Sequence, residues 1–346
     1  MKGPFQTFVA GTRLLSLAIL ATLHAAAQTS PTTDQSAAPV IFAPGVISSP
    51  ADDTAPTFTP DGQTIYFARS NGAAVAVMES QRKKDGGWTP PKIAPFSGRW
   101  HDLEAVLSPD GKFMIFASNR PDNGGDKALD GAWGGKNYPG HGGNLWRVER
   151  QGQAWGAPVR LAATVNSSNS VFSPSIVRDG SLYLMKASPE TGHFQIYRSQ
   201  LVNGAYQPAE RLPFSKEDSN NVDPTVAPDE SFMVFASSRP PTADKDLDLF
   251  IVFRQNGQWG EPVHLGPVVN SPSQEIEPRL GPDGHRLYFS SNRIVPVTLP
   301  ASTADTERAL QRMVEWDNGR MNLWSVDLAP WLKKAVGSQQ SAVNSP

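Results

Sequence analysis

The stretch that decides the fold lies at residues 105–120 and reads AVLSPDGKFMIFASNR. A short apolar segment leads into the turn Pro109-Asp110-Gly111, and the apolar triplet Met114-Ile115-Phe116 follows two residues later. Proline and glycine supply the backbone angles of a tight turn, so the stretch predicts two antiparallel strands joined by that turn. A triplet without polar alternation indicates a strand that is buried on both faces.

The same pattern occurs five times along the chain. The turn aspartates are Asp61, Asp110, Asp179, Asp229 and Asp283, at spacings of 49, 69, 50 and 54 residues. The triplets that follow the turns are Ile65-Tyr66-Phe67, Met114-Ile115-Phe116, Leu182-Tyr183-Leu184, Met233-Val234-Phe235 and Leu287-Tyr288-Phe289. A period near 50 residues is typical of a propeller blade.

Each copy contains sequence for two more strands. Third strands are expected at segments such as Leu145–Val148 and Leu323–Val326. Fourth strands are expected just after the aromatic residues Trp88, Trp155, Tyr206 and Trp259, each followed by a proline that an outer strand tolerates. The last copy lacks a fourth strand, but residues 39–44 match residues 262–267 position by position. We therefore expect the N-terminal strand to complete the last blade and close the ring.

The sequence thus predicts an all-β fold, a single β-propeller domain over residues 39–334 with four-stranded blades. Five blades are preferred. The alternative is a sixth, degenerate copy in the 69-residue interval, but a long loop accounts for the excess length of that interval.

The repeat resembles the TolB-type, WD40-like β-propeller family. The resemblance rests on the Pro-Asp-Gly turns and on the runs Phe-Ala-Ser-Asn-Arg at 116–120 and Phe-Ser-Ser-Asn-Arg at 289–293. It covers almost the whole predicted domain, although the third copy has Arg178 in place of the turn proline. TolB itself has six blades and an additional N-terminal domain, so the chain is not expected to be TolB. The family includes translocation scaffolds, peptidase-linked propellers and envelope binding proteins, and the resemblance therefore implies a fold more than an activity.

The N-terminus has the pattern of a secretory signal. A basic start, the apolar run Leu14–Leu23 and Ala25-Ala26-Ala27 predict a cleaved signal peptide at 1–27. A flexible leader is expected at 28–38 and a disordered tail at 335–346. The protein is then periplasmic or secreted, with no membrane span after signal cleavage. The net charge of −2 gives no reason to expect nucleic acid as a partner.

The long insertions fall on one face of the predicted ring. Strand direction alternates within a blade, so the Asp-Gly turns lie on one face, here called the turn face, and the loops between second and third strands lie on the other, the loop face. The loop-face insertions are residues 121–143, 240–248 and 294–320, and the last includes a predicted amphipathic helix at 306–316. Long loops on a rigid scaffold are where binding residues concentrate.

Acidic residues precede several of the turns by six or eight positions. They are Asp53, Asp102, Glu104, Asp223, Glu275 and Glu277, and they are expected at the loop-face mouth of the central channel. Arg120, Arg239 and Arg293 follow their turns by ten residues. Three interpretations remain open: an arginine–carboxylate network that joins blades, a site for a ligand or a cation such as calcium, or a catalytic acid–base pair.

Other candidate site residues are His101 beside the channel and Trp133, Tyr138 and His141 in the long loop of the second copy. There is no cysteine, and no Gly-x-Ser-x-Gly, His-Glu-x-x-His or Walker motif occurs. No catalytic residue, metal ligand or resident cofactor is therefore assigned. The leading hypothesis is a monomeric module that binds an envelope protein or glycan through the loop face. The alternatives are a carbohydrate-active hydrolase or lyase that uses the channel carboxylates, and a structural scaffold.

Overall fold

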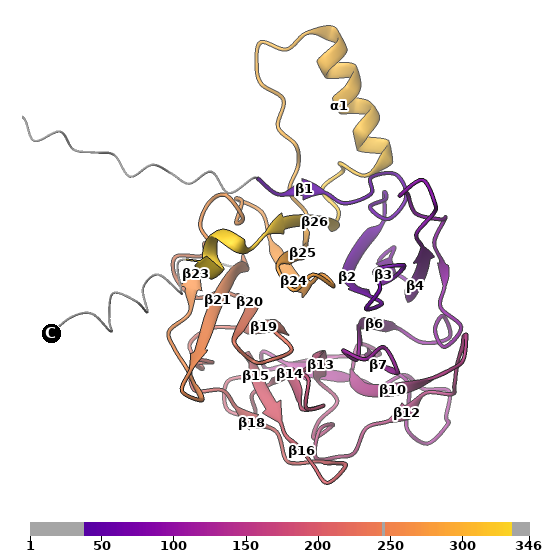
Figure 1. The fold of residues 1–346 in the computed structure, drawn as a ribbon, viewed down its shortest axis with the longest axis vertical. Coiled ribbons are helices and arrows are strands. Elements are labelled where there is room, and N and C mark those ends of the chain that lie inside the picture. Colours follow the sequence, from indigo (N-terminus) through magenta and orange to yellow (C-terminus); the bar gives the residue numbers. More distant parts are fainter. Residues whose placement is uncertain (1–37, 244–245, 334–346) are drawn as a thin grey trace, which may run out of the picture. The chain divides into compact units, whose positions relative to one another are not determined.

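The computed structural model describes residues 38–243 and 246–333, which form a five-bladed β-propeller (Figure 1). The five-bladed prediction is confirmed, and the 69-residue interval holds an inserted hairpin instead of a sixth blade. The predicted signal peptide at 1–27, the tail at 335–346 and all but the last residue of the leader at 28–38 lie outside the described residues.

Each blade is one antiparallel sheet, and the chain runs from the channel outward. The innermost strands are β2 (Asp52–Phe58), β6 (Asp102–Leu107), β13 (Val171–Ile176), β19 (Asn221–Val226) and β24 (Glu275–Leu280). The second strands are β3 (Thr64–Ser70), β7 (Phe113–Ser118), β14 (Leu182–Ala187), β20 (Phe232–Ser237) and β25 (Arg286–Ser291). The third strands are β4 (Val75–Gln81), β10 (Asn144–Gln151), β15 (Phe194–Ser199), β21 (Asp248–Gln255) and β26 (Asn322–Asp327).

The outermost strands are short and start after the predicted aromatic residues. They are β5 (Lys92–Ile93), β12 (Val159–Arg160), β18 (Glu210–Arg211), β23 (Val263–His264) and, in the last blade, β1 (Val40–Ile41). Small additional strands are β11 (Ala154–Trp155), β16 (Leu201–Val202), β17 (Ala205–Tyr206) and β22 (Gln258–Trp259).

The N-terminal strand closes the ring as predicted. Val40 pairs with Ser325 and Ile41 with Trp324, so β1 completes the sheet of β24, β25 and β26. The connection after β1 adds to this closure, because Ile47 is fully buried and the Ser48 hydroxyl donates a hydrogen bond to the Leu323 carbonyl oxygen at 3.3 Å. Closure covers the outer edge of β26 and leaves only the two-residue strand β1 as the outer edge of this sheet.

The apolar triplets of the second strands form the layers between blades. Ile65, Phe116, Tyr183, Val234 and Phe289 are each fully buried, as expected for strands covered on both faces. The aromatic residues that precede the fourth strands pack between neighbouring blades; Trp155, for example, donates from Nε1 to the Tyr66 hydroxyl of the preceding blade at 3.2 Å.

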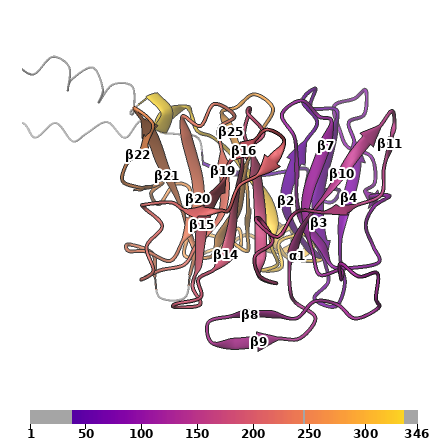
Figure 2. The same ribbon diagram turned by 90° about the horizontal axis from the view of Figure 1, so that it is seen from below.

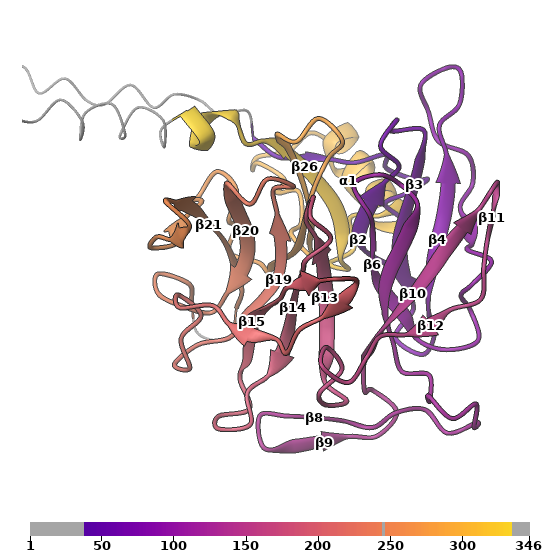
Figure 3. The same cartoon turned by 60° about the horizontal axis from the view of Figure 1, so that its bottom comes forward.

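Two insertions extend from the loop face and the rim. The hairpin of β8 (Gly131–Trp133) and β9 (Lys136–Tyr138) lies beyond the ends of the blades in Figures 2 and 3. Helix α1 (Thr303–Glu315) projects from the ring beside β26 and β1 (Figure 1). The helix starts three residues before the predicted position, because Ser302 and Asp305 form a capping box at its N-terminus.

Candidate functional site

The five innermost strands share a β-bulge in the middle of the channel wall. At this bulge each strand has one residue with positive φ: Ala55 (48°), Glu104 (52°), Ser173 (45°), Asp223 (55°) and Glu277 (49°). Each of them stands six residues before its turn aspartate. A bulge redirects the side chain that it carries. Because all five blades share it, the unusual backbone conformation belongs to the blade geometry and is not a local distortion at one residue.

Three of the predicted carboxylates occupy these bulges and come together inside the channel. Glu104, Asp223 and Glu277 are 4%, 4% and 7% exposed. Ser173 links two of them: its backbone N–H donates to Glu104 Oε2 at 2.6 Å, and its hydroxyl donates to Asp223 Oδ1 at 2.6 Å. The Glu277 N–H donates to Asp223 Oδ2 at 3.2 Å. We call Glu104, Asp223 and Glu277 the carboxyl cluster.

Burial and mutual repulsion favour the protonated forms of this cluster. Burial, with the charges of Asp223 and Glu277, raises the pKa of Glu104 to about 8. Burial, with the charge of Asp223, raises the pKa of Glu277 to about 7. Burial also raises the pKa of Asp223. At neutral pH the cluster therefore holds protons that ordinary carboxyl groups release.

The cation that acts on all three members of this cluster is Arg279, two residues beyond Glu277 along β24 toward the turn face. The side chain is 3% exposed, and Nη1 donates to the Pro278 carbonyl oxygen at 2.8 Å. Its Nε and Nη2 have no hydrogen-bond partner among the described residues. The Arg279 charge lowers the pKa values of all three cluster members, although less than burial raises them. It also lines the turn-face mouth of the channel, a cavity of about 220 Å³.

The other predicted carboxylates are bound to arginines within their own blades. Asp53, Asp102 and Glu275 are fully buried, and they pair with Arg69 at 2.6 Å, Arg120 at 2.5 Å and Arg293 at 2.9 Å. In the fourth blade Asn221 replaces the acid and accepts a hydrogen bond from Arg239.

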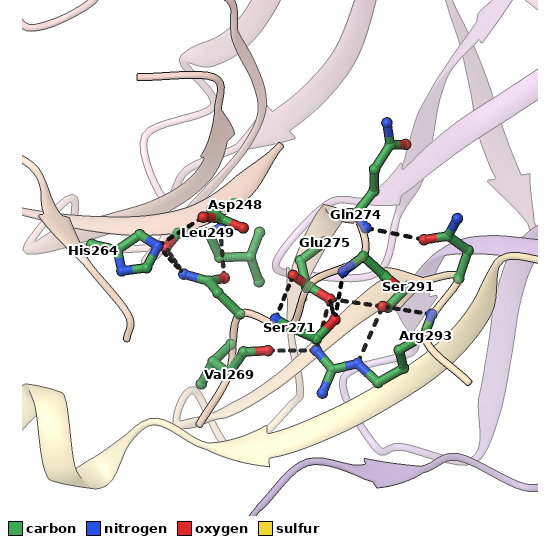
Figure 4. Close-up of polar contacts among 12 residues, drawn as sticks. Asp248, Leu249, His264, Val269, Ser271, Gln274, Glu275, Ser291 and Arg293 are labelled. Carbon is green, nitrogen blue, oxygen red and sulfur yellow. Dashed lines mark hydrogen bonds and ion pairs between the residues drawn. The ribbon is translucent and has the colours of Figure 1, made fainter. Parts of the chain in front are cut away.

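These arginines also bind the connection that enters the blade. The acceptors are the carbonyl oxygens of Val46 and Ile47 for Arg69, Phe96 for Arg120, Phe214 for Arg239 and Val269 for Arg293. Figure 4 shows this arrangement in the last blade, where Arg293 lies between Glu275, Ser291 and Val269. The guanidinium groups also stack on core aromatic rings; that of Arg120 lies 5.0 Å from the Phe116 ring centroid. The arginine–carboxylate pairs thus fix the connection from the preceding blade to the strands of the blade that it enters.

The remaining predicted residues meet in a pocket under the β8–β9 hairpin. His101, Glu104, Trp133, Tyr138 and His141 all line a cavity of about 430 Å³ on the loop face. Trp133 and Tyr138 stack with their ring centroids 4.0 Å apart, and the rings of His101 and His141 are 6.1 Å apart. The other walls are formed by Val75, Leu103, Asn119, Gly140, Gly142, Phe172, Met185 and Phe194. We call this cavity the hairpin pocket.

The hairpin that roofs this pocket is inserted in the second blade but is fixed to the third. The Ala132 N–H donates to the Ser170 hydroxyl at 2.9 Å, and that hydroxyl donates to the Ala132 carbonyl oxygen at 3.0 Å. At the hairpin turn, the Gly134 N–H donates to the Gly192 carbonyl oxygen at 3.1 Å. A side chain at Gly192 would collide with the Gly134 backbone. The roof is therefore held at both ends, and the pocket is preformed.

Sequence reasoning missed the residues that the third blade contributes. Phe172 and Phe194 pack edge-on, with centroids 5.9 Å apart, and each also contacts the Trp133 ring. Phe172 stands seven residues before its turn and has the appearance of an ordinary strand residue in the sequence. Ser173 and Arg279 were also missed, because neither has the appearance of a site residue in the sequence. Relative to their turns, they occupy the positions of Glu104 and Val106 in the second copy.

The described residues contain no group of three or more His, Asp or Glu side chains arranged to hold a metal ion. In the same part of the chain, no helix is long and apolar enough to cross a membrane.

Comparisons with known proteins return propellers of several kinds. No protein-family model matches the sequence, and no curated protein matches it. A structure of putative TolB from Agrobacterium tumefaciens is 17% identical, covers 70% of this chain and 71% of its own, and has a TM-score of 0.45. TolB from Acinetobacter baumannii is 15% identical, covers 80% of this chain and 54% of its own, and has a TM-score of 0.44. A thermostable family-43 glycoside hydrolase is 12% identical, covers 70% of this chain and 84% of its own, and has a TM-score of 0.45. At these identities the similarity concerns the fold alone.

Proposed function

We propose that this chain is an exported binding module that holds a group of a partner protein of the cell envelope in the hairpin pocket. The observation that carries the proposal is the pocket itself, a preformed cavity with aromatic walls and few polar groups. Its size suits a side chain of a partner.

The lining favours a protein group over a sugar ring. A sugar ring needs many hydrogen-bonding partners around its hydroxyl groups, whereas this cavity offers Glu104 at its floor, Asn119 and two histidines. The stacked rings of Trp133 and Tyr138 instead provide the kind of apolar anchor that dominates protein–protein binding. The signal pattern at 1–27 supports location in the periplasm or outside the cell.

Capture of partners from an envelope extract tests the proposal. We expect wild-type protein to retain a partner, and Trp133→Ala to weaken its binding by about 30-fold or more, the loss typical of an interface hot spot. Trp331→Ala is the matched control, because it removes a partly buried indole from the last blade, away from the hairpin pocket. Equal retention by the two variants, with the fold intact, would contradict the proposal.

A carbohydrate-active hydrolase is the second candidate, favoured by one observation. Glu104 lines the pocket, and its pKa of about 8 suits a general acid at neutral pH. Glycoside hydrolysis normally needs a second carboxylate beside the scissile bond, and neither Asp223 nor Glu277 lines the hairpin pocket. A polysaccharide screen with wild type and the Glu104→Gln/Glu277→Gln variant tests this candidate. Turnover by wild type that the double variant lacks would replace the binding proposal.

A further inference from the structure

The floor of the hairpin pocket presents an acidic oxygen without a protein partner. Glu104 is more than nine-tenths buried, and its Oε2 accepts the Ser173 N–H. Its other oxygen, Oε1, accepts no hydrogen bond from the described part of the chain. This oxygen is not among the fully buried atoms that lack a partner, so a donor or a cation that enters the pocket can reach it.

The surroundings of Glu104 contain more carboxyl groups than basic side chains. Three carboxyl groups share the channel with one guanidinium, that of Arg279, which makes no ion pair within 4.0 Å in the described structure. Among the described residues that line the hairpin pocket there is no lysine or arginine. The pocket therefore lacks the counter-ion that its floor would attract.

The walls of the pocket add to the attraction for a cation. Trp133, Tyr138, Phe172 and Phe194 all line it. The faces of aromatic rings are electron-rich and bind ammonium groups, more strongly where water is excluded. Aromatic walls above an acidic floor form a site for a positively charged group on an apolar stem.

We propose that the hairpin pocket accepts an alkylammonium group, such as the side chain of a lysine of the partner protein, with Glu104 as its counter-ion. This inference rests on the proposed binding function and specifies the chemistry of the bound group. The methylene stem of the ligand packs against the rings, and its ammonium group donates to Glu104 Oε1.

Binding of the ammonium group is then coupled to loss of a proton. Burial and the neighbouring carboxylates keep Glu104 largely protonated at neutral pH, with a pKa of about 8. An ammonium ion stabilises the ionised form, so binding expels the proton, and affinity rises as pH increases from 6 to 9. The ligand stays charged in this range because a lysine-type amine has a pKa near 10.4. The titratable and charged groups that face Glu104 are Asp223 of β19, Glu277 and Arg279 of β24, and His101 and His141 at the pocket rim.

Calorimetry with a pair of small probes tests the inference. Pentylamine and pentanol have the same stem, and only the amine carries a charge. At pH 8.5 we expect wild type to bind pentylamine at least about tenfold more tightly than pentanol. Glu104→Gln should abolish this preference and retain pentanol binding, whereas Glu307→Gln on exposed α1 should leave the preference unchanged. Equal affinity of wild type for the two probes, or binding of neither, overturns the inference.

A second measurement uses wild type alone, so it does not depend on the folding of a variant. Titration of pentylamine at pH 7 in two buffers of different ionisation enthalpy should show release of up to one proton per bound amine. Zero release overturns the inference. A lysine-containing peptide and spermidine, compared in the same assay, distinguish a protein side chain from a free polyamine. An envelope partner that is lost in Trp133→Ala but fully retained in Glu104→Gln would leave the proposed function intact and overturn only the cation assignment.

Discussion

The carboxyl cluster should make the stability of the propeller fall as the pH rises through neutrality. The perturbation that tests this is Glu104→Gln, which removes the ionisable group and keeps a carbonyl oxygen to accept the Ser173 N–H. In the unfolded chain the Glu104 carboxyl has an ordinary pKa near 4.5, and in the folded chain its pKa is about 8. The folded state therefore binds the proton more tightly. The stability that this group contributes is complete below about pH 4.5 and is lost as the pH rises to about 8.

The size of the effect follows from the two pKa values. A difference from 4.5 to about 8, at about 1.4 kcal/mol per pH unit, corresponds to at most about 5 kcal/mol between pH 4.5 and pH 9. Glu277, with its pKa raised to about 7, acts in the same direction. The charge of ionised Glu277 is itself one cause of the raised pKa of Glu104, so the two carboxyl groups contribute jointly to the pH dependence.

Urea denaturation at steps between pH 5 and pH 9 measures this dependence. We expect the wild-type free energy of unfolding to decrease over this range by several kcal/mol. The free energy of unfolding of Glu104→Gln should decrease less, so the difference between variant and wild type should shift steadily in favour of the variant as the pH rises. Glu307→Gln, which removes a carboxylate from exposed α1, is the control and should run parallel to wild type. A constant difference between Glu104→Gln and wild type from pH 5 to pH 9 would refute the assignment of a protonated, buried Glu104.

Three further predictions concern the scaffold. Arg120→Met should lower the free energy of unfolding by about 3–5 kcal/mol because it leaves the Asp102 carboxylate buried without a counter-ion, and adding Asp102→Leu should recover much of the loss in a denaturant titration. Deletion of residues 39–47 removes the closing strand, and differential scanning calorimetry should show a melting temperature at least 10 °C below that of the parent, roughly the effect of 6 kcal/mol in a domain of this size; a shift of only a degree or two would contradict ring closure. Gly143→Ala places a methyl group against a phenyl ring of β13 and should cost about 1–3 kcal/mol, while Gly260→Ala, which has ordinary contacts, should not, as thermal melts would show.

The repeat could be predicted from the sequence because each of its parts has a local cause. The Pro-Asp-Gly turns determine where strands reverse, and the fully apolar triplets identify the strands covered on both sides. Closure of the ring could also be predicted, because residues 39–44 resemble the fourth strands of the other copies and the last copy lacks such a strand. The predicted start of helix α1 was less accurate. The apolar pattern does not mark the first turn, whose position depends on the capping of the backbone by Ser302.

The roles of the acidic residues could not be separated in the same way. Asp102 and Glu104 stand eight and six residues before the same turn, so Arg120 is 18 positions from the first and 16 from the second. Both separations occur among the ion pairs, because Arg69 pairs with an acid 16 positions away and Arg120 with one 18 positions away. The sequence alone therefore does not show which acid Arg120 binds. The β-bulge decides between them. It directs Asp102 to the arginine and turns Glu104 into the channel. A strand without the bulge would place the two side chains on one face. The five bulge positions share no residue type, so the bulge could not be predicted from the sequence.

The hairpin pocket exists only where two features coincide in one blade. Asp223 and Glu277 stand at the same bulge as Glu104, yet neither lines the pocket. The second blade alone combines a carboxyl group at the bulge with the β8–β9 insertion, and the aromatic residues of the third blade supply the opposite wall. An activity that resided in the channel carboxyls as a group would not need the hairpin, whereas an activity of the pocket needs both. Removal of the hairpin therefore separates the two: it should abolish recognition of the alkylammonium group and leave in place the part of the pH dependence of stability that comes from Glu277, which does not line the pocket.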